Sequence, residues 1–157
     1  MFKDESTRKK IVDLLTKSYN AEIETVANYI ANSVNLDGVR AQHIKAALES
    51  DISEELEHAQ RLARRIKTID GVVPGSQALQ WTQTSLQPPK QTTDVVSVIK
   101  GVIAAEEEAI EGYQAIIEAT EGVDYVTQDL AIELQGDEQE HRREFIGFLK
   151  EYEQVNG

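Results

Sequence analysis

Apolar residues recur at intervals of three and four along four stretches of the chain, which is the period of an amphipathic helix. In the first stretch, Ile11, Leu15, Ile23 and Ile30 fall on one face of the predicted helix. The strict alternation of apolar and polar residues that marks a β-strand does not extend over any useful length. The pattern therefore predicts an all-α protein with helices at about 7–35, 39–69, 93–120 and 124–153.

Turn and capping residues separate these helices. Glycine suits the end of a helix, and aspartate suits its start, where the side chain accepts a hydrogen bond from a free backbone N–H. The residues in these roles are Asp37-Gly38, Gly71 and Gly122 at helix ends, and Asp94 and Asp124 at helix starts. Short turns therefore join the first helix to the second and the third to the fourth.

Residues 72–92 are polar and rich in proline, so they break the helical pattern. The segment is too long for a turn and has the length of a connection that crosses a helical bundle. We expect Trp81 and Leu86 to pack this crossover onto the helices. Two helical hairpins joined by a long crossover make a four-helix bundle, and 157 residues are the length of a single domain, 1–157.

Composition narrows the classes of function. A formal net charge of −12 repels phosphate backbones, which argues against a nucleic-acid partner. The absence of cysteine excludes disulfides, iron–sulfur clusters and thiolate zinc sites. The N-terminal segment lacks the apolar core of a signal peptide, and no uncharged apolar run approaches the roughly 20 residues of a membrane helix. We therefore expect a soluble, cytoplasmic protein that does not bind a membrane.

The two predicted hairpins repeat one pattern of acids, tyrosines and histidines. The first and third helices each carry a glutamate followed seven residues later by a tyrosine, namely Glu22 with Tyr29 and Glu106 with Tyr113. The second and fourth helices each carry Glu-x-x-His, namely Glu55 with His58 and Glu138 with His141. Residues three apart lie on one helical face, so each carboxylate and imidazole can converge on one point. The repeat predicts two hairpins packed about a pseudo-twofold axis.

Four carboxylates and two imidazoles inside such a bundle match the ligand set of a di-iron or di-manganese carboxylate centre. Burying four carboxylates without compensation is very costly, whereas two divalent cations balance their charge. Oxygen and imidazole ligands suit iron, manganese and zinc alike. The predicted metal ligands are Glu22, Glu55, His58, Glu106, Glu138 and His141, with Tyr29 and Tyr113 in reach of hydrogen bonds to the ligand glutamates.

Each part of this set also has a simpler explanation. A single Glu-x-x-His in an acidic helix is more often a solvated ion pair than a metal site. Glu24 competes with Glu22, which is favoured because its tyrosine repeats that of Glu106. His43 has no glutamate three residues before it and is expected to be an ordinary helix residue. Glu106 lies on the apolar stripe of its helix, whereas an exposed acidic face is expected for Glu107, Glu108 and Glu111.

Three segments carry a resemblance to a known family. DYVTQDLAIELQGDEQEH, from Asp124 to His141, closely resembles the last bundle helix of bacterioferritins. AEIETVANY and SEELEHAQR, residues 21–29 and 53–61, resemble their first and second helices. The resemblance implies a ferritin-like fold, a di-iron centre held by the six ligands above, and a homodimer or larger homo-oligomer. Bacterioferritins bind haem through a methionine on the second helix, but Leu56 follows Glu55 here and the only methionine is Met1, so no haem is expected.

The resemblance implies oxidation of ferrous iron by dioxygen or hydrogen peroxide, a ferroxidase activity. Tyr113, the symmetric partner of Tyr29, is more similar to rubrerythrin-type proteins, which reduce peroxide. A peroxide reductase or a manganese catalase-like enzyme is therefore the alternative within the oxidoreductases. The alternative outside them is a helical interaction module in which the metals serve only stability.

Overall fold

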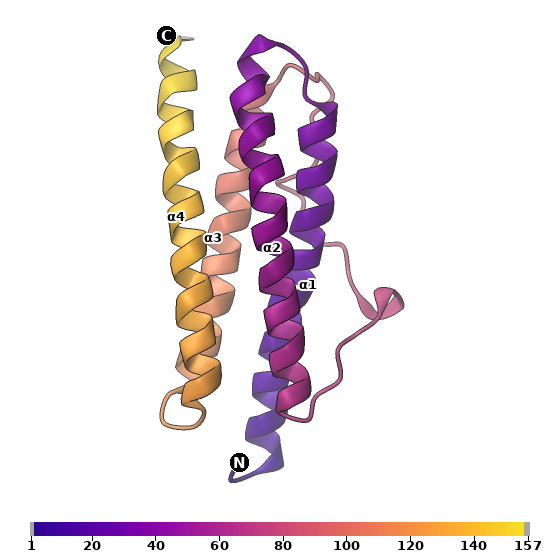
Figure 1. The fold of residues 1–157 in the computed structure, drawn as a ribbon, viewed down its shortest axis with the longest axis vertical. Helices are drawn as coiled ribbons and strands as arrows, with labels where there is room; N and C mark the ends of the chain where they lie inside the picture. The colour runs from indigo at the N-terminus through magenta and orange to yellow at the C-terminus, as the bar shows by residue number, and fades with distance from the viewer. Residues whose placement is uncertain (1, 156–157) are drawn as a thin grey trace.

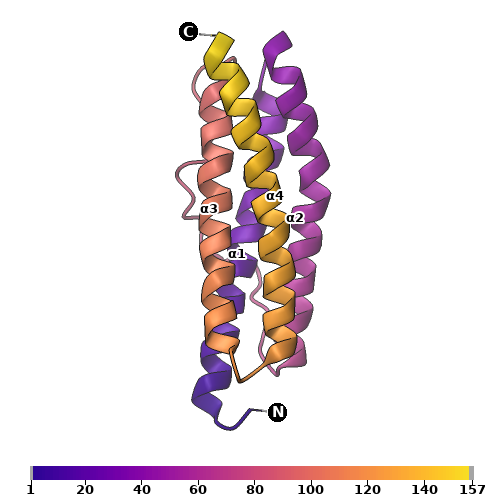
Figure 2. The same ribbon diagram turned by 90° about the vertical axis from the view of Figure 1, so that its left-hand side faces the viewer.

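The computed structural model describes residues 2–155, and four long helices account for most of them (Figure 1). The helices are α1 (Glu5–Asn35), α2 (Gln42–Thr68), α3 (Val95–Thr120) and α4 (Tyr125–Val155), with 3₁₀ turns η1 (Val39–Ala41) and η2 (Ser76–Ala78). The chain runs up α1, down α2, along the bundle in the crossover, then down α3 and up α4 (Figures 1 and 2). α1 packs against α2 and α3, and α3 packs against α4. The prediction of an all-α bundle of two hairpins and a crossover is confirmed.

Aspartate side chains begin three of the helices. Asp4 accepts a hydrogen bond from the Thr7 N–H at 2.7 Å, so α1 starts two residues before the predicted position. Asp94 caps α3 and Asp124 caps α4 through equivalent bonds of 3.1 Å, as the sequence predicts. The end of α2 differs from expectation, because the residue with the left-handed backbone is Asp70, with a φ of 66°, and not Gly71.

The crossover is held to the bundle by one apolar side chain and several polar ones. Leu86 is buried as predicted, but the prediction for Trp81 is wrong, since 61% of this residue is exposed. The crossover also passes close over α3 at Gly101, where an added Cβ would lie 2.3 Å from the Ser85 carbonyl oxygen. Only glycine permits that approach, so any side chain at position 101 would force the crossover away from α3.

The bundle core consists of two apolar clusters, one toward each end. The upper cluster includes Leu36, Ile44, Val98 and Phe145, with Tyr29 among its members. The lower cluster includes Ile11, Leu15, Ile66 and Leu134, with Tyr113 among its members. The six predicted metal ligands are buried but belong to neither cluster, so they form a polar layer in a core that is otherwise apolar.

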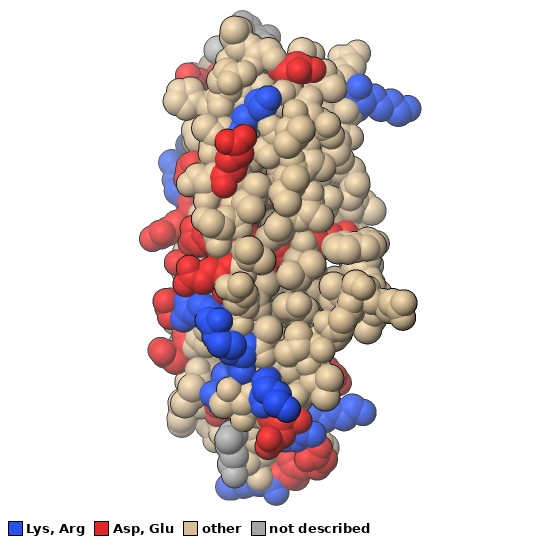
Figure 3. All heavy atoms as spheres, turned by 45° about the vertical axis from the view of Figure 1, so that its right-hand side comes forward, with Lys and Arg blue, Asp and Glu red and all other residues tan. Residues whose placement is uncertain are grey.

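The surface is uneven in its charge. Figure 3 views the side on which α1 and the crossover lie, and the upper half of this face carries few charged side chains. Exposed apolar residues on the first hairpin include Ile30, Val34 and Leu56. Within residues 2–155, no helix combines the length and the hydrophobicity that crossing a bilayer requires.

Candidate metal centre

All four helices contribute to the polar layer. Glu22 comes from α1 and Glu106 from α3, while α2 supplies Glu55 and His58, and α4 supplies Glu138 and His141. Every one of these residues is at least 94% buried, so their charged groups are removed from bulk water. The structure thus brings together the six residues that the sequence repeat singles out.

The six side chains divide into two overlapping groups. One contains Glu22, Glu55, His58 and Glu138, and the other contains Glu55, Glu106, Glu138 and His141. Within each group, one atom from every residue lies within 4.8 Å of the others. Glu55 and Glu138 belong to both groups, so the two groups adjoin and are consistent with a dinuclear metal site.

Both histidines turn Nδ1 toward the centre of this layer. His58 Nδ1 lies 2.9 Å from Glu138 Oε1 and 3.8 Å from Glu55 Oε2. His141 Nδ1 lies 3.1 Å from Glu55 Oε1 and 4.0 Å from Glu106 Oε1. Each imidazole therefore points its inner nitrogen at carboxylates from helices other than its own as well as at the glutamate one turn before it.

The layer contains many buried polar atoms with no hydrogen-bond partner among the described residues. Seven of them belong to the six candidate ligands: Glu22 Oε2, Glu55 Oε1 and Oε2, His58 Nδ1, Glu106 Oε2, Glu138 Oε1 and His141 Nδ1. Buried polar groups are nearly always paired, because an unpaired one carries a desolvation cost of about 1–3 kcal/mol. Oxygen and imidazole nitrogen atoms in this arrangement fit divalent metal ions, which would supply the missing partners.

The two tyrosines cross between α1 and α3. Tyr29 Oη donates a hydrogen bond of 2.5 Å to Glu106 Oε1, and Tyr113 Oη donates one of 2.7 Å to Glu22 Oε1. Burial, together with the nearby carboxylates, raises the pKa of both tyrosines well above the usual value, so both remain protonated donors. Each bond occupies one oxygen of its glutamate and leaves the other facing the layer.

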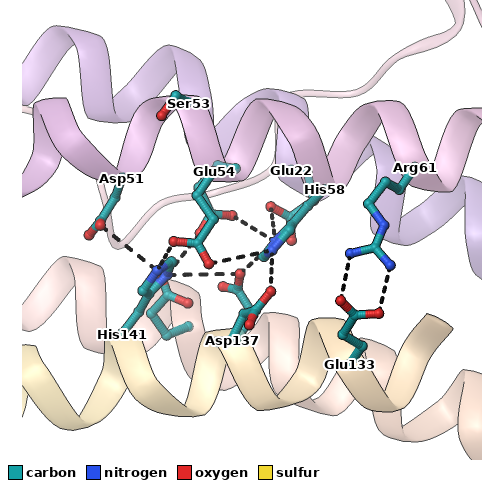
Figure 4. Close-up of polar contacts among 12 residues, drawn as sticks. Glu22, Asp51, Ser53, Glu54, His58, Arg61, Glu133, Asp137 and His141 are labelled. Carbon is teal, nitrogen blue, oxygen red and sulfur yellow. Dashed lines mark hydrogen bonds and ion pairs between the residues drawn. The ribbon is translucent and has the colours of Figure 1, made fainter. Parts of the chain in front are cut away.

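The outer nitrogens of the histidines meet a further set of acids, Asp51, Glu54 and Asp137, which we call the outer acids (Figure 4). His58 Nε2 lies 3.0 Å from Asp137 Oδ2, and His141 Nε2 lies 2.8 Å from Glu54 Oε2. The pairing is reciprocal, since an acid on α4 holds the histidine of α2 and an acid on α2 holds the histidine of α4. A carboxylate on the second nitrogen fixes the ring orientation and makes the first nitrogen a better metal ligand.

Sequence reasoning missed the outer acids, although a signal for two of them exists. Glu54 and Asp137 each stand one residue before the glutamate of a Glu-x-x-His pair, so EELEH and DEQEH share an acid at the first position. The structure also shows the exposed acidic face that the sequence predicts, formed by Glu107, Glu108 and Glu111, and His43 is exposed as well. Glu24, the competitor of Glu22, is buried, but both of its carboxylate oxygens accept hydrogen bonds from the crossover.

Protons partly compensate the negative charge of the layer in the absence of metal. Burial raises the pKa of Glu22 and Glu138 well above the usual value, and repulsion by Glu55 adds to both shifts. Burial raises the pKa of Glu106 to about 7, although hydrogen bonds with Glu138 and Tyr29 oppose the shift. These groups must lose their protons before all their oxygens can bind a cation.

Glu55 and His141 behave as an ion pair within the same layer. Burial opposes the ionisation of Glu55, but the close approach of the Glu22 and His141 side chains outweighs it and lowers the pKa of Glu55 to about 2. Burial likewise disfavours the charged form of His141, but Glu55, 3.1 Å away, and the charges of Glu106 and Asp51 raise the pKa of His141 to about 10. A metal bound at His141 Nδ1 must therefore displace a proton.

Comparison with known proteins agrees with this geometry. A family model described as the ferritin-like domain matches residues 12–155. The chain belongs to the ferritin family. This ferritin-like protein is 28% identical over 145 residues to the DNA protection during starvation protein of Pyrococcus furiosus, an alignment that covers 90% of this chain and 77% of the relative. The expected membership of the ferritin-like di-iron carboxylate superfamily is thereby confirmed.

Solved structures share the fold of this ferritin-like chain. A bacterioferritin-related protein from Bacteroides fragilis, described as a dodecameric thioferritin, superposes with a TM-score of 0.85 at 25% identity, over 95% of this chain and 89% of the other. A ferritin-like di-iron carboxylate protein from Bacillus anthracis superposes with a TM-score of 0.78 at 24% identity, over 93% of this chain and 99% of the other. The buried Glu/His layer occupies a fold of this class and is consistent with a dinuclear metal site.

The metal-free protein should lose stability as the pH rises. Glu106 changes its pKa from an ordinary 4.5 to about 7 on folding, so between these values the folded state binds more protons than the unfolded state. The free energy of unfolding therefore falls across this interval. Glu22 and Glu138 act in the same direction above pH 4.5, and His141 extends the fall from pH 6.5 toward about 10. Thermal unfolding in the presence of a chelator, followed across this range, measures the effect.

A matched pair of variants isolates the contribution of the layer to this pH dependence. Glu106→Gln removes a titrating group and should flatten the decline between pH 4.5 and about 7. Glu107→Gln changes an exposed neighbour and should leave the slope unaltered. A melting temperature of the chelated wild-type protein that rises over this interval would contradict the protonation scheme.

Removal of either paired outer acid should weaken the binding of divalent metal. Glu54→Ala and Asp137→Ala each free the outer nitrogen of one histidine, and losses of such partners typically lower metal affinity about 10–100-fold. Titration of the metal-free protein with Co²⁺, followed by calorimetry, measures the affinity. Glu133→Ala is the control, because Glu133 is an exposed acid of α4 that pairs with Arg61. An equal loss in all three variants would show that general surface charge, and not the histidine contact, is responsible.

Proposed function

We propose that the polar layer is a dinuclear metal centre that oxidises ferrous iron with dioxygen or hydrogen peroxide. The ligands would be Glu22, Glu55, His58, Glu106, Glu138 and His141. The observation that carries the proposal is the pair of overlapping Glu/His groups, which share Glu55 and Glu138 and contain seven buried atoms with no hydrogen-bond partner in residues 2–155. Membership of the ferritin family supports it, because a bound di-iron centre would supply redox chemistry of this kind.

The protein's own residues have three tasks in this scheme. The glutamates neutralise the cations, and the histidines, held by Glu54 and Asp137, point their inner nitrogens at the centre. The tyrosines hold one oxygen each of Glu22 and Glu106, which would leave the second oxygen of each glutamate free to bind a cation. The apolar clusters above and below the layer exclude water, so the attraction between carboxylates and cations is stronger than it would be in solvent.

The reaction needs protons as well as electrons. Two ferrous ions give up one electron each, and one molecule of hydrogen peroxide accepts both electrons with two protons and leaves as two water molecules. With dioxygen as the oxidant, the same two electrons and two protons give hydrogen peroxide. In the metal-free protein the pKa of Glu106 is about 7, so this carboxyl group would release a proton when a cation binds to both of its oxygens.

Peroxide reduction or a manganese catalase-like reaction is the second candidate. The observation that favours it is the Tyr113–Glu22 bond, which makes the centre symmetric and gives it the tyrosine that is similar to rubrerythrin-type proteins. The ligand set suits iron, manganese and zinc. The two candidates differ in the metal that supports turnover and in whether peroxide yields dioxygen.

The double variant Glu55→Ala/Glu138→Ala should lose both metal binding and oxidation of ferrous iron, because it removes the two glutamates common to both groups. Elemental analysis after anaerobic loading should give two irons per chain for the wild-type protein, and absorbance after addition of dioxygen or peroxide follows the oxidation. Glu57→Ala/Glu140→Ala is the matched control, since it removes two exposed acids from the same helices.

The possible outcomes of this experiment separate the candidates. Repeated oxidation of added ferrous iron by the wild-type protein supports a ferroxidase, whereas dioxygen release from peroxide by the manganese-loaded protein supports a catalase-like enzyme. Metal binding that raises the melting temperature without redox activity at any loading would leave a metal-stabilised interaction module. Little metal in the wild-type protein, or equal metal in both double variants, would overturn the proposed site.

We also propose that copies of the chain associate through the first hairpin. Ile30 and Val34 are exposed on α1, four residues apart, and Trp81 is exposed on the crossover. Large apolar side chains exposed one helical turn apart would form part of an interaction surface if a second copy covered them. A bacterioferritin-related protein with 25% sequence identity is described as a dodecamer, which supports a homodimer or larger homo-oligomer here.

The double variant Ile30→Glu/Val34→Glu should therefore reduce the size of the assembly, because it buries like charges if two copies pack face to face. Light scattering coupled to size-exclusion chromatography measures the mass. Ile132→Glu on α4 is the control, since Ile132 is 50% exposed and Ile30 is 48% exposed. An unchanged mass in the double variant, or the same loss in the control, would place the interface elsewhere.

A further inference from the structure

A cavity of about 490 Å³ lies between α1, α3 and the crossover. Glu22 and Tyr113 form part of its lining, so the cavity lies next to two residues that are joined by a hydrogen bond in the polar layer. It lies against α1 and α3, whereas the outer acids belong to α2 and α4. This cavity, which we call the α1–α3 cavity, therefore lies on a different side of the candidate metal centre from the outer acids.

The crossover forms one wall of the α1–α3 cavity and is anchored by α1. Both oxygens of the buried Glu24 accept backbone hydrogen bonds, from Thr82 at 3.0 Å and from Gln83 at 2.8 Å. Asn20 makes two further bonds of 2.7 Å with the backbone of Gln80. Glu24 lines the cavity, but its oxygens are already occupied by this anchor. It is therefore a poor ligand for a cation that enters there.

The walls near Glu22 are small and uncharged. They include Ala21, Ala105, Ala109 and Gly112, and an added Cβ at Gly112 would meet Ser18 Oγ at 3.1 Å. Exposed charged residues that line the cavity are Asp13, Lys17 and Glu108. A hydrated divalent cation would find no free carboxylate among the small residues to replace its water before it reached Glu22, which makes this route costly.

The α2–α4 side has the opposite character. Glu54 and Asp137 have side chains that are 40% and 33% exposed, and each touches a ligand histidine directly (Figure 4). Asp51, the third outer acid, is more buried, and its Oδ1 lies 3.8 Å from His141 Nε2. A cation arriving at this side meets carboxylates at the surface, then carboxylates and imidazoles of the centre, so its water can be replaced step by step.

We propose that the α1–α3 cavity is the access passage for the oxidant, a small uncharged molecule such as dioxygen or hydrogen peroxide, and that cations approach past the outer acids. The use of the passage by the oxidant rests on the proposed redox function. The existence of a passage for small neutral molecules does not depend on that function. The two substrates would then reach the centre from opposite sides, and the oxidant would meet it at Glu22 and Tyr113.

The absence of cysteine allows a direct test of the passage that does not depend on activity. Ala109→Cys places a single thiol in the cavity wall, where a small neutral methanethiosulfonate should modify it several-fold faster than cationic or anionic reagents of similar size. Ser53→Cys, at an exposed position of α2, should show a much smaller difference between the neutral and the charged reagents, and Ala131→Cys, in the lower apolar cluster, should react slowly with all of them. A thiol at 109 that is as slow as that at 131, or that shows no preference for the neutral reagent, would overturn the proposal.

A second test asks whether the passage serves the oxidant. Ala109→Phe, with Ala109→Leu as a milder version, partly fills the cavity beside Glu22 and should slow the oxidation of bound ferrous iron several-fold with dioxygen and with peroxide, tested separately. The rate of Co²⁺ binding to the metal-free protein should not change. Ala115→Phe, at a half-buried position of α3 outside the cavity lining, is the control for added bulk.

The outcomes distinguish the passage from the proposed function. If the wild-type protein does not oxidise ferrous iron, the proposed function fails, while the thiol test still decides whether the cavity admits small neutral molecules. If the wild-type protein oxidises iron and the filled variants do so at the same rate, the oxidant passage is wrong. Slower Co²⁺ binding in the filled variants would assign the cavity to the cation instead.

Discussion

The buried layer of four carboxylates and two imidazoles is the constraint on which the rest of the bundle depends. Such groups resist leaving water, and the layer lies between two apolar clusters that cannot pair with them. Protonated glutamates, the Glu55–His141 ion pair and two tyrosine hydroxyls satisfy part of the demand. Seven inner atoms, including the facing atoms of this ion pair, still have no hydrogen-bond partner among the described residues, which is the strongest structural reason to regard the layer as a place for cations.

The pseudo-twofold repeat pairs part of these buried polar groups in the same way in both halves of the bundle. Each tyrosine reaches from its own helix to the glutamate of the facing helix, and each histidine is held by an acid of the facing helix. The symmetry ends outside the layer. The crossover covers one side and leaves a cavity with small uncharged walls beside Glu22, whereas the α2–α4 side presents the outer acids, so one symmetric centre has two chemically different approaches.

Sequence reasoning predicted the four helices and most of their ends, because apolar periodicity and capping residues act locally. It failed where contacts between distant segments decide the outcome. Trp81 is exposed, and Glu24 and Asn20 anchor the crossover through polar contacts that leave no periodic signal in the sequence. Two of the outer acids, Glu54 and Asp137, occupy the first position of EELEH and DEQEH, but a repeated acid has meaning only when the facing histidine is known.

The sequence by itself determined which residues share a helical face, since a spacing of three or four places side chains together whatever the helix packs against. That is sufficient to single out both Glu-x-x-His pairs and the repeated glutamates. Only the tertiary structure decided that Glu22 faces the layer while Glu24, two residues away, turns to the crossover. It also decided which nitrogen of each histidine points inward and where a cavity opens, because these features depend on how separate helices and the crossover pack together.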